Sequence, residues 1–176
     1  MMLRKNILTA LLMAIGFILR QLIPGLIGGM KGDIMLSVIF VSLLINREFK
    51  NALLTGLLGG LITAMTTTFP GGQLPNIIDK LITCMVIYYM IKVLSRFEGN
   101  PVITGVIGFV GTVISGSIFL GAALMITGLP APFTTLFSVV VLPTAVVNIF
   151  MTLVIYGTVK TAIKVSGIKL DTPVKA

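Results

Sequence analysis

The sequence predicts an all-α integral membrane protein: one bundle of six transmembrane helices, with both termini in the cytoplasm. Of its 176 residues, 56% are hydrophobic and only 10% are charged, and the mean hydropathy is +1.12. A soluble domain carries about 25% charged residues, so this chain lacks the polar side chains to cover a globule in water. Its apolar residues fall into six runs joined by short polar connectors, which suits a lipid bilayer as the solvent.

Each apolar run is judged against the roughly 20 residues that a spanning helix needs. The first run is long for the apolar part of a signal peptide, and no A-x-A-like cleavage site follows it, so we expect it to be the first span. The second run is short and is expected to be tilted, shielded or incompletely spanning. The expected spans of this single domain, 1–176, are 7–26, 34–45, 52–68, 77–94, 102–127 and 133–163.

The basic residues predict the orientation of the bundle. Ten of the thirteen Lys and Arg residues fall at one set of helix ends. Only Arg20, Lys31 and Lys80 fall at the other. Cytoplasmic loops carry an excess of Lys and Arg, so the richer set, which includes both termini, is assigned to the cytoplasm. We therefore expect a multi-pass protein of the cell membrane.

Small residues predict where helices touch. Two runs carry them at every fourth position, namely Gly56, Gly60 and Ala64 in the third and Gly108, Thr112 and Gly116 in the fifth. Such faces let backbones approach closely inside a bilayer, and we expect them to pack within the bundle. Ala10 and Ala14 form a further pair on the first span. That pair either packs internally or offers a flat face to a partner helix.

Three outer connectors are rich in glycine or proline, and each leads into a helix. They read GGMKGD before the second span, FPGGQLPNIIDK before the fourth and GLPAPFT before the sixth. The free N–H groups and the positive dipole end of a helix N-terminus attract anions. We therefore expect three N-termini to converge on one extracellular site that suits a ligand carboxylate.

Asp79 and Lys80 stand just inside the fourth span, where charge is expensive and usually has a partner. Two interpretations are open. The two side chains form an ion pair with each other or with another helix, or Asp79 binds a ligand ammonium and Lys80 a ligand carboxylate. Lys31 is an alternative partner for that carboxylate, or else a lysine at the level of the lipid headgroups.

Three other polar residues also have two interpretations. Asp33 and Asn76 stand where a helix N-cap belongs, and Asp79 is spaced to complete a capping box with Asn76. Both residues are also candidates for ligand binding. Asn148 lies deep in the sixth span, where an amide needs hydrogen-bond partners. It is either a link between helices or a ligand contact.

Aromatic residues complete the candidate site. Phe69 and Phe119 either form an apolar wall of the site or face lipid and core. Pro143 frees a backbone carbonyl in the sixth span and is expected to kink it. The candidate substrate-binding residues are Met30, Lys31, Asp33, Phe69, Gln73, Asn76, Asp79, Lys80 and Asn148.

The residues that several kinds of site require are absent from the sequence. The chain has no histidine and one cysteine, Cys84, so we expect no metal site, no cofactor and no internal disulfide. It has no G-x-x-x-x-G-K-[ST] loop for ATP and no plausible catalytic acid pair, so it is not expected to be an enzyme. The net charge of +8 is spread over short clusters rather than one face. The expected partner of these charges is the lipid bilayer and not nucleic acid.

Three stretches resemble one known family. They are GGMKGD at Gly28–Asp33, TTFPGGQLPNIIDK at Thr67–Lys80, and VVLPTAVVNIF at Val140–Phe150. All three are similar to the corresponding stretches of TrpP-type tryptophan transporters. The resemblance covers roughly residues 5–163. The two loop motifs are fairly specific, whereas the apolar helices are not.

The resemblance implies a function and a set of partners. TrpP-type proteins look like S components, the substrate-binding subunits of energy-coupling factor transporters. Such a subunit has six helices, binds its substrate from outside and topples in the membrane to release it. Two ATPase subunits and a transmembrane coupling subunit supply the energy. The A-x-x-x-A face that contacts the coupling subunit maps here to Ala10 and Ala14.

Other functions remain open from the sequence. A tryptophan site needs partners for an ammonium and a carboxylate, a flat apolar slot and an acceptor for the indole N–H. The same groups would suit another aromatic amino acid or a vitamin. An alternative is a stand-alone secondary transporter. Such proteins often contain inverted repeats, and here only the Gly-Gly loops after the first and third expected spans resemble each other. A scaffolding protein without a ligand is a third class, which the polar outer loops disfavour.

Overall fold

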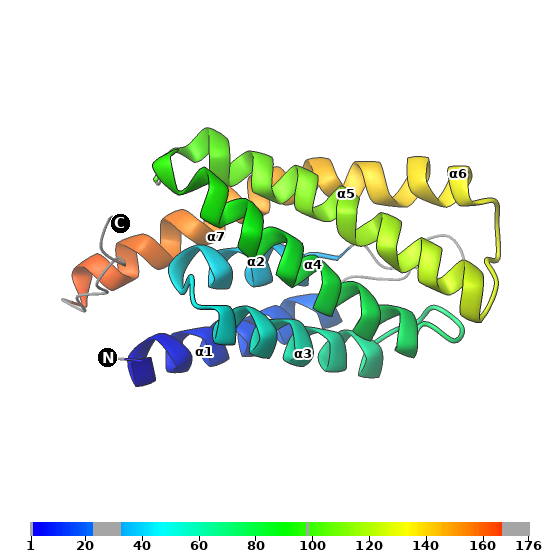
Figure 1. The fold of residues 1–176 in the computed structure, drawn as a ribbon, viewed down its shortest axis with the longest axis horizontal. Coiled ribbons are helices and arrows are strands. Elements are labelled where there is room, and N and C mark those ends of the chain that lie inside the picture. The colour runs from blue at the N-terminus through cyan, green and yellow to red at the C-terminus, as the bar shows by residue number, and fades with distance from the viewer. Residues whose placement is uncertain (1, 23–32, 98, 167–176) are drawn as a thin grey trace.

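The protein is all-helical in its computed structural model, which describes residues 2–22, 33–97 and 99–166. Six long helical segments follow one another in that part of the chain (Figure 1). The first five are α1 (Met2–Gln21), α2 (Met35–Ile45), α3 (Phe49–Met65), α4 (Gln73–Val93), which a short 3₁₀ turn η2 (Leu94–Phe97) extends, and α5 (Pro101–Ile126). The sixth combines α6 (Phe133–Leu136), a π-helical stretch η3 (Phe137–Val141) and α7 (Leu142–Val165).

Each predicted span corresponds to one of these segments, with differences at the ends. Helix α4 begins at Gln73 rather than at 77, because Pro75 falls in its first turn, where proline is tolerated. The prolines and glycines of that stretch had suggested a longer loop. The end of the first predicted span, residues 23–26, lies outside the described residues.

The sixth segment widens directly before Pro143. Proline has no backbone N–H, and its ring clashes with the carbonyl of the residue four positions earlier, which is Val139. The π-helical stretch Phe137–Val141 occupies this position. The sequence predicted a kink at Pro143; the structure has a π-helical stretch before it, a feature that is frequent at functional sites.

Helix α2 forms the centre of the bundle. Ten of its eleven residues are buried, and it contacts α1, α3, α4, α5 and α7. Its Phe40 is fully buried in the main core cluster. The second apolar run is thus short because protein, rather than lipid, surrounds it. It is shielded, one of the three outcomes expected from the sequence.

The two small-residue faces pack inside the bundle, as predicted. A Cβ atom on Gly60 would lie 3.0 Å from the Ile77 Cα atom, so α3 and α4 touch backbone to backbone there. A Cβ atom on Gly108 would lie 2.7 Å from the carbonyl oxygen of Asn148, so α5 and α7 are equally close. These contacts hold α3 against α4 and α5 against α7.

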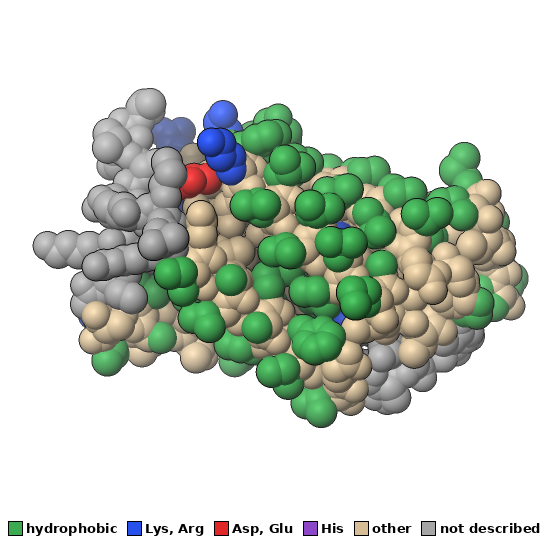
Figure 2. All heavy atoms as spheres, turned by 90° about the horizontal axis from the view of Figure 1, so that it is seen from below, with side chains coloured by type: hydrophobic (Ala, Val, Ile, Leu, Met, Phe, Trp, Pro, Cys, Tyr) green, Lys and Arg blue, Asp and Glu red, His purple; other side chains and the backbone are tan. Residues whose placement is uncertain are grey.

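The outer surface of the bundle is apolar. Large hydrophobic side chains are exposed on every long segment except α2. In Figure 2 they are spread over one whole face, while Lys and Arg gather mainly at one end. Among the described residues, two helices, Pro101–Ile126 and Phe133–Val165, are long and apolar enough to cross a membrane. The start of α1 and the end of α7 lie at the same end of the bundle (Figure 1).

We predict that replacing Gly108 with Ala destabilises the protein, whereas replacing Gly121 with Ala does not. Both glycines lie in α5, but a Cβ atom on Gly121 meets nothing within 4 Å. Overpacking costs about 1–3 kcal/mol, so Gly108→Ala should lower the melting temperature of the purified protein by several degrees. Gly121→Ala should leave it unchanged or raise it, because alanine favours helix. Equal melting temperatures for the two variants would show that α5 and α7 are not in close contact.

Candidate functional site

One end of the bundle holds a pocket. Sixteen residues line it, and its empty volume, including the open mouth, is about 510 Å³. The lining residues come from α1, from Asp33 and the helix α2 that follows it, from the α3–α4 connection, and from α4, α5, η3 and α7.

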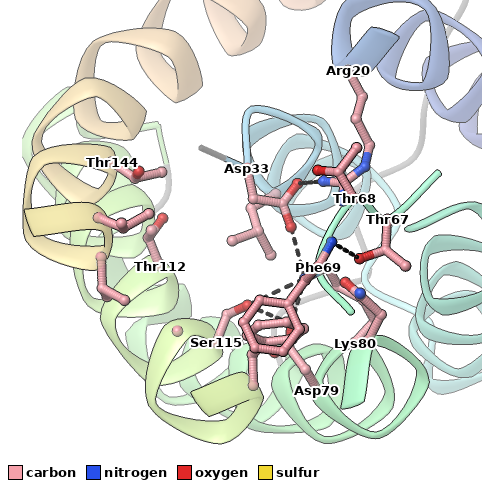
Figure 3. Close-up of a pocket in the computed structure, with 16 residues that line it drawn as sticks. Arg20, Asp33, Thr67, Thr68, Phe69, Asp79, Lys80, Thr112, Ser115 and Thr144 are labelled. Atoms are coloured by element: carbon pink, nitrogen blue, oxygen red, sulfur yellow. Dashed lines mark hydrogen bonds and ion pairs between the residues drawn. The ribbon is translucent and has the colours of Figure 1, made fainter. Parts of the chain in front are cut away.

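Four charged side chains form a continuous chain along one side of this pocket. Arg20 Nη1 lies 2.8 Å from Asp33 Oδ1, and Lys80 Nζ lies 2.7 Å from Asp33 Oδ2. Lys80 also forms a close ion pair with its neighbour Asp79. Figure 3 shows the Arg20 and Asp33 side chains pointing toward each other. With two cations and two anions, these residues, which we call the charge chain, have no net charge.

Hydroxyl groups complete the hydrogen bonding of the charge chain. Arg20 Nε donates to Thr66 Oγ1 at 2.9 Å. Asp79 accepts from Ser115 Oγ and from Thr83 Oγ1, both at 2.8 Å. Buried charges require such partners. The four charged residues therefore join α1, the start of α2 and α4 into one electrostatic unit, with α5 attached through Ser115.

Asp33 stays ionised in this setting. It precedes α2, and its side chain is 15% exposed. Burial alone would raise the pKa of its carboxyl group, but the ammonium of Lys80 and the guanidinium of Arg20 outweigh that effect and hold the pKa below its ordinary value. Asp33 is thus an anion shared by two cations.

The rest of the pocket lining is apolar with a few hydroxyls. Phe69 and Phe119 meet edge to face, with ring centroids 5.3 Å apart and planes at 81°. Val140 and Val141, from the π-helical stretch, extend this surface. In Figure 3, Thr112 and Thr144 lie across the cavity from Arg20. A ligand with a charged group and a flat apolar body fits a pocket that is lined by both charged and aromatic side chains.

A tight turn places Phe69 over the pocket. Its backbone N–H donates to Thr67 Oγ1 at 3.2 Å, and its carbonyl accepts from the N–H of Gly72 at 3.0 Å. Gly71 between them has φ of +69°, which side chains with a Cβ atom rarely adopt. Gly71 therefore suits the turn that folds Phe69 inward, and a Cβ atom on Gly72 would lie only 2.8 Å from Thr67 Oγ1.

The structure brings five of the nine predicted site residues to the pocket. Asp33, Phe69, Asn76, Asp79 and Lys80 all line it. Gln73 is exposed at the first turn of α4, and Asn148 is buried behind the pocket; neither lines it. Met30 and Lys31 lie outside the described residues.

The predicted helix caps are wrong. The N-cap of α2 is Ile34 and that of α4 is Gly72, and neither makes a side-chain capping bond. The carboxylate of Asp33 binds Arg20 and Lys80 instead, because two cations are stronger partners than a backbone N–H. Asn76 falls inside the first turn of α4 and donates to the Gly72 carbonyl at 2.6 Å, so no capping box forms.

Asn148 links helices. Its Nδ2 atom donates to the Asp33 carbonyl at 3.0 Å and to Thr112 Oγ1 at 2.9 Å. Its Oδ1 atom accepts from Ser37 Oγ at 3.0 Å. These contacts fasten α7 to α5 and to the start of α2. Of the two interpretations left open by the sequence, Asn148 therefore fits the link between helices.

Sequence reasoning missed Arg20. It counted this arginine with the outer loops, although Arg20 falls inside the apolar run 7–26, where charge is a sign of function. In the structure it is 4% exposed and lines the pocket. The hydroxyls were also missed, because Ser and Thr are common in membrane helices and carry no distinct signal. These are Thr67, Thr68, Thr112, Ser115 and Thr144.

Comparison with known proteins identifies the family. The model of the tryptophan transporter TrpP family matches residues 2–164. This chain belongs to the TrpP family. A probable tryptophan transport protein of Clostridium acetobutylicum is 41% identical over 165 residues, covering 94% of this chain and 96% of that protein. One of Bacillus subtilis is 40% identical over 164 residues, covering 93% and 95%.

The family also settles the class of the protein. A third relative, from Clostridium perfringens, is 37% identical and has the same name as the first two. TrpP proteins are membrane transporters, which agrees with the apolar surface and the two long apolar helices. No solved structure matches this chain.

We predict that Asn148→Ala destabilises this TrpP protein. The substitution removes three hydrogen bonds between helices. Thr112 keeps its bond to the Gly108 carbonyl and the Asp33 carbonyl keeps the Leu36 N–H, but the buried Ser37 hydroxyl loses its acceptor, and a buried group left unpaired costs about 1–3 kcal/mol. Thermal unfolding should show a loss of several degrees. Thr158→Ala on the same helix is the control, because that hydroxyl is exposed and bonds only within its own helix. If both variants unfold at the parent's temperature, Asn148 does not hold the helices together.

Proposed function

We propose that this chain is the substrate-binding S component of an energy-coupling factor importer for tryptophan, and that the pocket is its substrate site. The observation that carries the proposal is the pairing of a neutral charge chain with an aromatic wall in one cavity. An amino acid with a flat side chain presents the same two features. The name of the family and those of the three relatives favour tryptophan over a vitamin.

The pocket suggests a direction for the bound ligand. The ammonium and carboxylate of tryptophan lie at the charge chain, and the indole lies against Phe69 and Phe119, which favour edge-to-face contacts with another ring. A hydroxyl of Thr112 or Thr144, across the cavity, accepts the indole N–H. Tryptophan would then contact α1, α2, α4, α5 and α7 together.

The proposed topology has six spans with both termini in the cytoplasm. Two observations support it: ten of thirteen basic residues fall at one set of ends, and α1 starts at the same end of the bundle at which α7 finishes (Figure 1). The pocket is at the opposite end, where it is lined by Arg20 near the end of α1, by Asp33 just before α2 and by residues 67–69 between α3 and α4. It would therefore open to the outside of the cell, where an importer meets its substrate.

The proposed partners are a transmembrane coupling subunit and two ATPase subunits. The chain has no phosphate-binding loop of its own. Ala10 and Ala14 are both exposed on α1, so they do not pack inside the bundle and are available to a partner helix. The same helix carries Arg20 in the pocket, which gives the proposed docking helix a direct link to the substrate.

A stand-alone secondary transporter is the second candidate. One observation favours it: Asp79 is a carboxylate 1% exposed within an apolar helix, and such groups serve as proton relays in transporters. Tryptophan uptake into vesicles separates the two proposals. An S component requires the ATPase module and ATP, whereas a secondary transporter works without them and responds to a proton gradient.

We predict that the purified chain binds tryptophan and that Phe119→Ala weakens the binding about two- to tenfold. The estimate follows from the roughly 0.5–1.5 kcal/mol that an aromatic pair contributes beyond its buried area. Phe150→Ala is the control, because Phe150 is 65% exposed on the outer surface. Titration calorimetry in detergent measures both. A parent chain that binds no tryptophan would refute the proposed function, and equal affinities of parent and Phe119→Ala would place the indole elsewhere.

We also predict that Ala10→Leu combined with Ala14→Leu abolishes uptake but leaves tryptophan binding intact. The two alanines lie one turn apart on one face of α1, and leucines there would keep a partner helix at a distance. Ala162→Leu on the exposed surface of α7 is the matched control. Uptake is measured in vesicles that contain the full module. A double variant that transports normally would show that this face does not dock.

A further inference from the structure

The carboxylate of Asp33 is held as a free carboxylate ligand would be held. One oxygen lies 2.8 Å from Arg20 Nη1 and the other 2.7 Å from Lys80 Nζ. The two cations come from different helices, α1 and α4, and their side chains are only 5% and 2% exposed. A substrate carboxylate that enters the pocket finds its two strongest partners already occupied by this internal anion.

We propose that Asp33 occupies the substrate's carboxylate position in the empty protein and leaves it when the substrate binds. The inference rests on the proposed function of the pocket as an amino-acid site. The substrate carboxylate takes the place between Arg20 and Lys80, and the released Asp33 carboxylate pairs with the substrate ammonium. Asp33 is then a specificity residue, because the exchange is complete only for a ligand that carries both charges.

The count of charges explains this selectivity. The charge chain has two cations and two anions, all paired with one another. A zwitterion adds one charge of each sign, so all six charges can be paired after the exchange. A ligand with only a carboxylate displaces Asp33 and leaves it unpaired. A ligand with only an ammonium adds a positive charge without an anion to match it. Unpaired charge away from water is strongly unfavourable.

Asp33 rather than Asp79 is the anion that can move. Asp79 lies within α4 and is 1% exposed. Besides Lys80 it accepts from Ser115 and Thr83, which fix both of its oxygens. Asp33 stands before the first turn of α2 and is more exposed, at 15%. Its carboxylate can therefore turn without disturbing a helix, while Asn148 continues to hold its backbone carbonyl.

The test compares three ligands that differ only in charge: tryptophan, indole-3-propionate, which lacks the ammonium, and tryptamine, which lacks the carboxylate. For the parent chain, both analogues should bind at least tenfold more weakly than tryptophan. Asp33→Asn removes the internal anion and leaves the charge chain with a net positive charge. The affinity of indole-3-propionate relative to tryptophan should then rise at least tenfold, and tryptamine should stay weak.

A control and two contrary outcomes complete the experiment. Glu48→Gln removes the same charge near the start of α3, at the other end of the bundle, and should leave all affinity ratios unchanged. If Asp33→Asn lowers the affinity for tryptophan and indole-3-propionate by the same factor, Asp33 is a structural residue and the inference is wrong. If Asp33→Asn does not fold, the affinities of the parent chain for the three ligands test the inference. If the parent binds indole-3-propionate or tryptamine as tightly as tryptophan, the inference is wrong. A parent that binds none of the three refutes the proposed function instead.

Discussion

The structure depends on one constraint: a bilayer does not solvate ionised side chains, so the charges inside this bundle must satisfy one another. Arg20, Asp33, Lys80 and Asp79 do so in an unbroken chain in which each cation meets a carboxylate. The cost of removing such charges from water is several kcal/mol for each ion. It is offset only when the geometry and the hydrogen bonds are good. Here hydroxyls from Thr66 just after α3, from α4 and from α5 supply further bonds to the charged groups.

This constraint also arranges the helices. The ion pairs bring the end of α1, the start of α2 and the second turn of α4 to one place, and the small faces around Gly60 and Gly108 bring α3 to α4 and α5 to α7. The π-helical stretch before Pro143 supplies two valines to the same cavity. Ion pairing and close backbone packing therefore leave a cavity whose lining combines charged with apolar side chains. That combination matches an amino acid with an aromatic side chain.

The sequence predicted the helical class, the internal packing of the small faces and, as one of two open interpretations, the ion pair between Asp79 and Lys80. These predictions succeed because they rest on local features: apolar runs, a four-residue repeat and charge next to charge in an apolar helix. The caps proposed for Asp33 and Asn76 are wrong. Local sequence suggested that Asp33 caps its own helix, but its carboxylate binds residues that are distant in sequence: Arg20, 13 residues away, and Lys80, 47 residues away.

The role of Arg20 shows the same limit of sequence reasoning. Counting basic residues by side of the membrane is informative about orientation, but it treats each residue as part of a loop. Arg20 follows the helix periodicity of α1 and faces inward, with 4% exposure. Its position within an apolar run was the available signal. Its partner Asp33 and the pocket beside them become evident only from the fold.

The central claim is that the charge chain is the site of the substrate's charged groups. A structure of the protein with bound tryptophan tests it most directly. The account predicts the tryptophan carboxylate within hydrogen-bond distance of both Arg20 and Lys80, with the indole against Phe119 and with Asp33 turned toward the ammonium. Tryptophan bound elsewhere, with Asp33 still bridging Arg20 and Lys80, would contradict it.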